Sequence, residues 1–444
     1  MEQNLTHGPV WKTVLRFSLP FLLSYFLQTF YGMADLYIIG RFCGLTSTTA
    51  VSIGSQVMHM LTVMIVGLSM GAVVNIGQAV GAGDRQKLSD SVGNTVTLFL
   101  SLSGAATAIL LLCVRWIVSA VSAPADAADG TVSYLTICFL GIPFITAYNM
   151  ISAVLRGMGD SKTPLYLIAL SCLTNILLDY GLIGGLQMGP AGAALGTVLS
   201  QTVSVLLALL VIRRQKLPLS GENFHPNRQV TGQILKIGIP VALQDGFIQI
   251  AFLTITAFAN HRGLEDAAAV GVVEKMIGFL FLVPSSMLQT VSTLTAQNIG
   301  AEKYARARQV LCYACAISVI WGLFVAVLMR YQSENLISMF LSSPRAVELG
   351  CQYMKGYVWD CMLAGIHFSF SGFFCAWGLS GLSFLHNALS IVCVRIPLSY
   401  VAARYFKNTL FPMGLASPAG SGMSVLICFA AYFWLRKRQK KSGI

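Results

Sequence analysis

Two acids and two neutral polar residues stand inside long apolar stretches of this sequence. Asp35 lies in LPFLLSYFLQTFYGMADLYIIGR, Asn175 and Asp179 lie in SCLTNILLDYGLIGG, and Thr197 lies in GPAGAALGTVLSQ. Residues four apart share one face of a helix, so Asn175 and Asp179 would point the same way. The four side chains offer carboxylate, amide and hydroxyl oxygens that could coordinate a hard monovalent cation, or the two carboxylates could share a proton.

Each of these groups also has a structural alternative. Asn175 could bond a neighbouring helix, and Thr197 could donate to the backbone of its own helix. A carboxylate near the centre of a spanning helix costs roughly 2.5 to 3.5 kcal/mol, so acids at such positions usually serve a function. The sequence therefore favours a functional role for Asp35 and Asp179 over a purely structural one.

The composition places these residues in an integral membrane protein. Of 444 residues, 55% are hydrophobic and only 10% are charged, and the mean hydropathy is +0.71. This much apolar surface exceeds what a water-soluble core can bury. Windows of about 20 apolar residues, the length that crosses a bilayer, predict an all-α fold of twelve transmembrane helices. They lie near 14–38, 51–73, 92–115, 131–153, 165–184, 191–212, 234–258, 270–292, 310–330, 352–377, 382–403 and 415–435.

The sequence repeats itself once along its length. At an offset of 219 or 220 residues, Pro20 aligns with Pro240, Gln78 with Gln297, and Pro124 with Pro344. The offset spans six helices, an even number, so the two halves keep one orientation and form a parallel repeat of two six-helix lobes. The predicted parts are an N-lobe (1–212), a cytoplasmic linker (213–233) and a C-lobe with a basic cytoplasmic tail (234–444).

The basic residues orient the helices. The net charge is +12, and most Lys and Arg residues fall in loops on the side of the N-terminus. By the positive-inside rule, both termini are expected in the cytoplasm of a cell in whose plasma membrane the chain lies. The charge therefore indicates contact with anionic membrane lipid and not with nucleic acid. In this topology Asp35, Asp179 and Thr197 each lie on the order of 10 Å inside the outer ends of their helices.

The C-lobe does not repeat the polar set of the N-lobe. The repeat places Arg395 opposite Asn175 and Ser399 opposite Asp179, and an arginine cannot be a cation ligand. The remaining intramembrane acids of the C-lobe, which we keep as secondary candidates with Arg395, are Asp245, Glu274 and Asp360. Glu274 lies four residues after the predicted start of its helix, so an interfacial ion pair with Lys275 is an alternative for it.

Proline interrupts the first helix of each lobe. Pro20 and Pro240 would each kink a helix, because proline removes one backbone hydrogen bond. Pro20 lies close to the cytoplasmic end of its helix, where a helix-start role is an alternative to bending.

Several motifs together resemble the multidrug and toxic compound extrusion (MATE) transporters, in their prokaryotic branch. They are LPFLLSYFLQTFYGMADLYIIGR, GQAVGAGD, LRGMGDSKTP, NILLDYGLIGG and GPAGAALGTVLSQ, and the likeness covers essentially the whole chain. The resemblance implies a monomeric antiporter that exports amphipathic, cationic organic compounds in exchange for H⁺ or Na⁺. It also implies that Asp35, Asn175, Asp179 and Thr197 form the cation site of the N-lobe.

Other functions find little support in the residues. The sequence has no GxxxxGK[ST] motif for ATP and no paired histidine spacing for a catalytic metal, so we expect neither an enzyme nor a bound cofactor. A lipid-linked oligosaccharide flippase of the same broad superfamily is the main alternative. Such a flippase would favour a cavity rich in Arg and Lys for pyrophosphate, whereas Arg395 is the one basic residue deep in a predicted helix.

Overall fold

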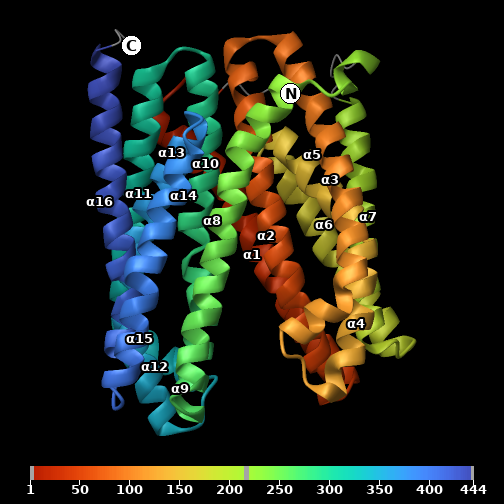
Figure 1. Cartoon of the computed structure of the whole chain (residues 1–444), viewed down its shortest axis with the longest axis vertical. Coiled ribbons are helices and arrows are strands. Elements are labelled where there is room, and N and C mark those ends of the chain that lie inside the picture. The colour runs from red at the N-terminus through yellow and green to blue at the C-terminus, as the bar shows by residue number, and fades with distance from the viewer. Residues whose placement is uncertain (1–4, 215–219, 442–444) are drawn as a thin grey trace. The chain divides into compact units, whose positions relative to one another are not determined.

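The computed structural model describes residues 5–214 and 220–441, and every secondary-structure element in these ranges is helical (Figure 1). The first half of the chain forms α1 (Val10–Phe42), α2 (Leu45–Ala82), α3 (Arg85–Ala120), α4 (Ala125–Leu140), α5 (Ile142–Gly157), α6 (Lys162–Asp179), η1 (Tyr180–Gly185), α7 (Gly189–Arg214) and η2 (Gly221–Phe224). The second half forms α8 (Arg228–Asn260), α9 (Leu264–Leu280), α10 (Leu282–Gly300), α11 (Tyr304–Ser338), α12 (Pro344–Tyr357), α13 (Asp360–Ala376), α14 (Ser380–Ser390), η3 (Ile391–Arg395), α15 (Ile396–Tyr405) and α16 (Phe411–Lys441).

The helices are long and apolar enough to span a membrane. Within the described residues, nine segments qualify by length and composition, and eleven do if α4 with α5, bent by 50°, and α12 with α13, bent by 40°, each count as one span. The helix α1 is not among them, although its 33 residues exceed the length needed. Counted with α1, the elements follow the predicted order, so the all-helical membrane fold is confirmed.

Two compact units make up the chain. Of the described residues, the N-terminal unit holds 19–214 and 220–242, with 5–6 and 300–302, and the C-terminal unit holds 243–299 and 303–441, with 7–18. The chain therefore passes between units inside α1, next to Pro20, and inside α8, next to Pro240. Since α1 begins at Val10, the helix-start role considered for Pro20 is wrong. Residues 215–219 of the predicted linker lie outside the described residues, as do 1–4 and 442–444.

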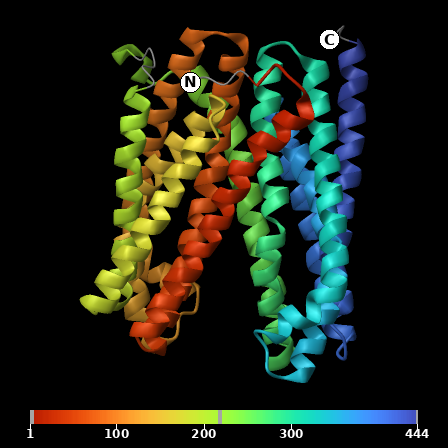
Figure 2. The same cartoon turned by 180° about the vertical axis from the view of Figure 1, so that it is seen from behind.

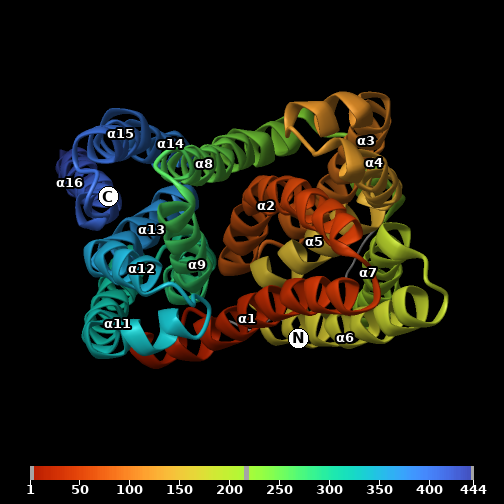
Figure 3. The same ribbon diagram turned by 90° about the horizontal axis from the view of Figure 1, so that it is seen from below.

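Close helix packing organises the N-terminal unit. Its helix α2 packs against α4 and α5, and α6 packs against α7, as the view along the helices shows (Figure 3). A side chain at Gly71 of α2 would overlap the carbonyl group of Ile234, and one at Gly238 would overlap that of Leu68. These glycines let the first part of α8 approach α2 at backbone distance, which is the small-residue packing typical of membrane helices.

The segment between the two halves of the chain is fastened to α3. Asn223 in η2 donates to Asp90 Oδ1 at 2.7 Å, and Thr97 donates to the Phe224 carbonyl at 2.8 Å. Asn94 Oδ1 accepts from the backbone N–H of Asn227 at 2.6 Å. The described part of this segment therefore belongs structurally to the N-terminal unit.

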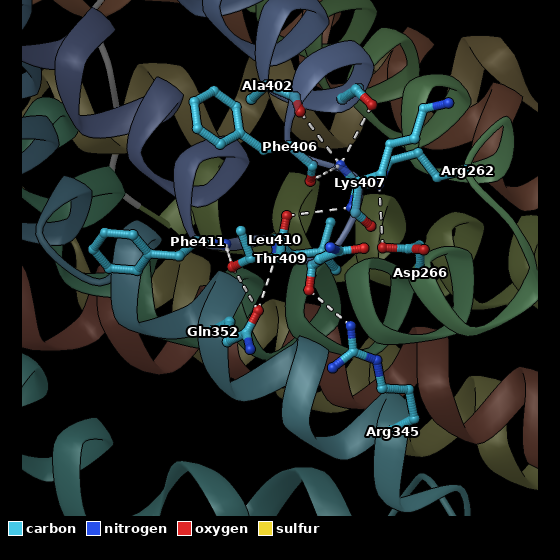
Figure 4. A network of polar contacts seen from close by, with 12 residues as sticks. Arg262, Asp266, Arg345, Gln352, Ala402, Phe406, Lys407, Thr409, Leu410 and Phe411 are labelled. Atoms are coloured by element: carbon cyan, nitrogen blue, oxygen red, sulfur yellow. Dashed lines mark hydrogen bonds and ion pairs between the residues drawn. The ribbon is translucent and has the colours of Figure 1, made fainter.

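In the C-terminal unit, α13 packs against α11 and α16, two helices that run the length of the unit (Figures 1 and 2). At one end of this unit, a network of polar contacts holds the segment that follows α15 against the start of α9 and against α12 (Figure 4). The Arg262 guanidinium pairs with Asp266 at 3.2 Å and donates to the last-turn carbonyls of Ala402 and Ala403, each at 3.4 Å. A cation at the end of a helix satisfies carbonyls that have no partner within the helix, so Arg262 caps α15.

Candidate functional site

The four residues predicted for the N-lobe site all lie in the N-terminal unit and are all buried. Asp35 is on α1, Asn175 and Asp179 are on α6, and Thr197 is on α7. Asn175 and Asp179 are 0% exposed, Asp35 is 7% exposed and Thr197 is 9% exposed. Polar groups this deep in a membrane protein need partners or an ion.

Asp179 stands at an irregularity of its helix. The α-helix α6 ends at Asp179 and continues as the π-helical segment η1. Such wide turns are rare and are often found at functional sites, because the extra residue changes the direction in which side chains project. Here the irregularity begins directly after the carboxylate.

A glycine of the next helix fixes where the Asp179 side chain lies. A Cβ at Gly196 of α7 would overlap Asp179 Oδ1 and would lie 3.5 Å from Asn175 Nδ2. Asn175 and Asp179 therefore both face α7, as their spacing predicts. The missing side chain at Gly196 leaves the room that the Asp179 carboxylate occupies.

The carboxylates lie close enough to interact electrostatically, since Asp35 and Asp179 are neighbours in the buried interior. The buried polar atoms of the site without a hydrogen-bond partner in the described structure are Asp35 Oδ1, both carboxylate oxygens of Asp179 and both amide atoms of Asn175. Thr197 donates to the Ala193 carbonyl of its own helix at 3.1 Å, which is the backbone hydrogen bond considered for it from the sequence. The Thr197 hydroxyl oxygen can still accept a hydrogen bond or contact a cation. Two buried carboxylates with open oxygens offer a place for protons or for a small cation.

Sequence reasoning missed a fifth member of this group, Tyr31. It is half-buried on α1, one turn before Asp35. It interacts electrostatically with Asp35 and Asp179, and its hydroxyl lies within hydrogen-bonding reach of Thr197. A phenol can donate to a carboxylate and accept from a protonated group. The four-residue spacing in YGMAD would have pointed to Tyr31, because a residue one turn before Asp35 shares its face.

The C-terminal unit gathers a different set of buried charges. Arg395, at the end of η3, is 8% exposed and donates to the Tyr357 hydroxyl at 2.8 Å. Its guanidinium carbon lies 4.8 Å from the centre of the Phe252 ring. Asp360 and Glu274 are its electrostatic partners, and both oxygens of Asp360 have no hydrogen-bond partner in the described residues. This cluster carries its own cation.

The other secondary candidates occupy separate positions. Glu274 lies well inside α9, which begins at Leu264, and its Oε2 accepts from Thr256 at 2.8 Å. The predicted helix start near 270 is therefore wrong, and the partner of Glu274 is a hydroxyl rather than Lys275. Asp245 of α8 lies near Cys375 instead of joining the cluster around Arg395.

Fold and site together define a polytopic membrane protein with a buried polar site. The MatE family profile matches residues 20–181 and residues 240–401, two segments whose ends are offset by the 220 residues of the sequence repeat. The matches cover well over half of the chain, which therefore belongs to the MatE family.

Curated relatives span nearly the same length. The chain is 26% identical over 449 residues to the probable multidrug resistance protein YoeA of Bacillus subtilis, covering 99% of this chain and 97% of the relative. It is 28% identical over 430 residues to YpnP of the same organism, also named a probable multidrug resistance protein, covering 97% and 95%. The multidrug export protein MepA of Staphylococcus aureus is 25% identical over 409 residues, with 90% and 89% covered.

Solved structures share the fold. A MATE structure in complex with MaL6 gives a TM-score of 0.89 at 21% identity, covering 99% of this chain and 98% of that chain. A MOP superfamily transporter from Pyrococcus furiosus, described as having a binding pocket of reverse polarity, also gives 0.89 at 21% identity, covering 98% and 97%. At these identities the likeness establishes the fold alone.

Proposed function

We propose that this chain is a secondary antiporter that exports amphipathic, cationic organic compounds in exchange for H⁺ or Na⁺. The observation that carries the proposal is the carboxylate pair Asp35 and Asp179, buried side by side with open oxygens. The names of the relatives, multidrug resistance and export proteins, support the choice of cargo. No enzymatic step and no cofactor enter this account.

The two carboxylates couple the ion to transport by charge. When both are ionised, the N-terminal site holds two buried negative charges, a state that is costly away from water. Entry of a proton or Na⁺ neutralises part of this charge, with Asn175 and Thr197 supplying further oxygens to a metal cation. A cation that favours one conformation, and a cargo that favours another, give obligatory exchange.

The ion gradient supplies enough energy for export. Each positive charge moving inward releases about 2.3 kcal/mol per 100 mV, and each pH unit adds about 1.4 kcal/mol for a proton. We place the chain in the plasma membrane as a monomer with both termini cytoplasmic, an orientation that the excess of basic residues in the loops on that side supports.

A flippase for lipid-linked oligosaccharides is less well supported. Binding a pyrophosphate would require basic groups free to meet it. Arg395 is instead surrounded by Tyr357, Phe252 and the carboxylates of Asp360 and Glu274. Its charge is already compensated within the C-terminal unit.

Dye efflux from cells that lack endogenous pumps tests the proposal. Cells expressing the chain should accumulate several-fold less of a fluorescent organic cation such as ethidium than cells expressing Asp179→Asn at the same level in the membrane. A protonophore in Na⁺-free buffer should abolish the difference. Accumulation in wild-type cells equal to that in cells with the empty vector would exclude the antiporter, and rescue of a strain lacking its oligosaccharide flippase would support the alternative.

A further inference from the structure

A pocket opens where three helices of the C-terminal unit end or begin. Its cavity volume is about 90 Å³, and it is lined by Arg308 of α11, Phe373 and Trp377 at the end of α13, Tyr432 and Arg436 near the end of α16, and two leucines. This volume is well below the roughly 300 to 1,000 Å³ of drug-sized sites, so the pocket admits only a small group. The pocket belongs to neither of the buried charge clusters described above.

The polar groups of the pocket are cations and neutral side chains, with no acid among them. Neither Arg308 nor Arg436 forms an ion pair with any residue that the structure describes, where the ion pairs are Arg262 with Asp266 and Arg345 with Glu348. The indole N–H of Trp377 is buried and has no hydrogen-bond acceptor among the residues that the structure describes. Two guanidinium groups and an indole N–H can only donate, so the pocket selects an anion.

Aromatic rings form the remaining wall of the pocket. Trp377 stacks on Tyr304 with ring centres 5.7 Å apart, and Phe373 meets Tyr432 edge to face at 5.9 Å. Beyond Tyr432, Trp434 is 57% exposed. Rings with a polar edge gather where the lipid headgroups lie, so this wall suits a ligand with an anionic head and an apolar body.

The position of the pocket agrees with a lipid headgroup. In the proposed topology the start of α11 and the ends of α13 and α16 all lie at the cytoplasmic face, and the basic stretch RKRQKK follows Leu435 directly. Anionic lipids are concentrated in that leaflet and attract Lys and Arg near the surface. Arginine also matches a phosphate with two parallel hydrogen bonds.

We propose that this pocket binds the phosphodiester headgroup of an anionic glycerophospholipid in the cytoplasmic leaflet. Arg308 and Arg436 hold the phosphate from two helices, Trp377 donates a third hydrogen bond, and the aromatic wall packs on the start of the acyl chains. The proposal rests on the proposed orientation of the chain but not on its transport activity.

Native mass spectrometry of the purified, delipidated full chain tests this site with phosphatidylglycerol as the probe. In Arg308→Gln/Arg436→Gln the affinity for the first bound phosphatidylglycerol should fall roughly tenfold, because two cations at the phosphate are lost. The matched control Arg330→Gln/Lys437→Gln removes the same charge from the same two helices outside the pocket, and should stay within twofold of wild type. Equal affinity of the two double variants would overturn the proposal.

Two further arms identify the ligand. Phosphatidylcholine, whose ammonium group offsets its phosphate charge, should bind the wild type more weakly than phosphatidylglycerol does, and millimolar inorganic phosphate should not displace phosphatidylglycerol. Displacement by inorganic phosphate would make this a site for the free anion and overturn the lipid assignment.

The variant Trp377→Phe keeps a ring but removes the N–H. It should weaken phosphatidylglycerol binding by about twofold to fivefold, and it tests the site if the double variant does not fold. Lipid binding with failed dye efflux would leave this site standing while excluding the antiporter.

Discussion

The two lobes carry different charges at the corresponding positions of one repeated fold. Asn175 and Asp179 of the N-terminal unit correspond to Arg395 and Ser399 of the C-terminal unit. A π-helical segment interrupts the helix in both, following Asp179 in one and ending at Arg395 in the other. The N-terminal site must obtain its positive charge from outside, whereas the C-terminal cluster carries one on its own chain.

This difference suggests a division of labour between the units. A site with two carboxylates and no internal cation changes its charge whenever an ion enters or leaves, which is what coupling requires. A cluster with a built-in guanidinium keeps its charge nearly constant. We therefore assign ion coupling to the N-terminal unit and a structural, charge-compensating role to Arg395.

The largest expected effect comes from a matched pair of truncations at the repeated position. Asp179→Ala should reduce dye efflux to the level of the empty vector, because the remaining carboxylate no longer forms a pair. Ser399→Ala should retain efflux within twofold, since the Ser399 hydroxyl is buried without a hydrogen-bond partner in the described residues. Equal losses in the two variants, at equal membrane expression, would remove the asymmetry between the units.

Removing the internal cation should destabilise the C-terminal unit. Arg395→Gln leaves Asp360 buried without its counter-charge, which typically costs about 3 to 5 kcal/mol. The double variant Arg395→Gln/Asp360→Asn should recover most of this loss, because the uncompensated carboxylate is then gone. Thermal unfolding of the purified proteins measures both steps. The single variant Asp360→Asn completes the comparison. If the double variant loses as much unfolding free energy as the two single variants together, Arg395 and Asp360 do not form a charge pair.

A single methyl group should disturb the N-terminal site without unfolding it. In Gly196→Ala the new Cβ overlaps Asp179 Oδ1, so the carboxylate must turn away from α7. Efflux should fall about tenfold or more, as expected when a reacting group is displaced by about 1 Å. Gly181→Ala in η1 is the control, because a Cβ there meets nothing within 4 Å. Full activity of Gly196→Ala would show that the position of Asp179 is not critical.

The smallest effect is expected for the Tyr31 hydroxyl. Tyr31→Phe removes one polar group beside Asp35 and Asp179 while keeping the ring. Efflux should fall roughly threefold to tenfold, the effect of losing one ordinary hydrogen bond, and its pH profile should move relative to wild type. An unchanged rate and profile would make Tyr31 a packing residue only.

Residue type and spacing are sufficient to predict the helices and the burial of the four polar residues of the N-terminal unit, because apolar windows and intramembrane acids are local features of the sequence. The start of α9 was placed too late, because Glu265 and Asp266 give its first turn the composition of a loop. Acids are in fact favoured at a helix N-terminus by the helix dipole. Gly196 could not be found from sequence, since its role depends on how closely α7 approaches α6. The sequence singles out Arg395 but not its partners, which come from α8, α9, α12 and α13.

The most direct test of the central claim follows ion movement itself in proteoliposomes that contain the purified chain and an internal pH or Na⁺ indicator. Adding an organic cation outside a wild-type vesicle should drive H⁺ or Na⁺ in the opposite direction across the membrane. Asp35→Asn and Asp179→Asn should each abolish this coupled flux while Ser399→Ala retains it. Coupled ion flux at the wild-type rate in both Asp variants would contradict the assignment of the coupling site to the N-terminal unit.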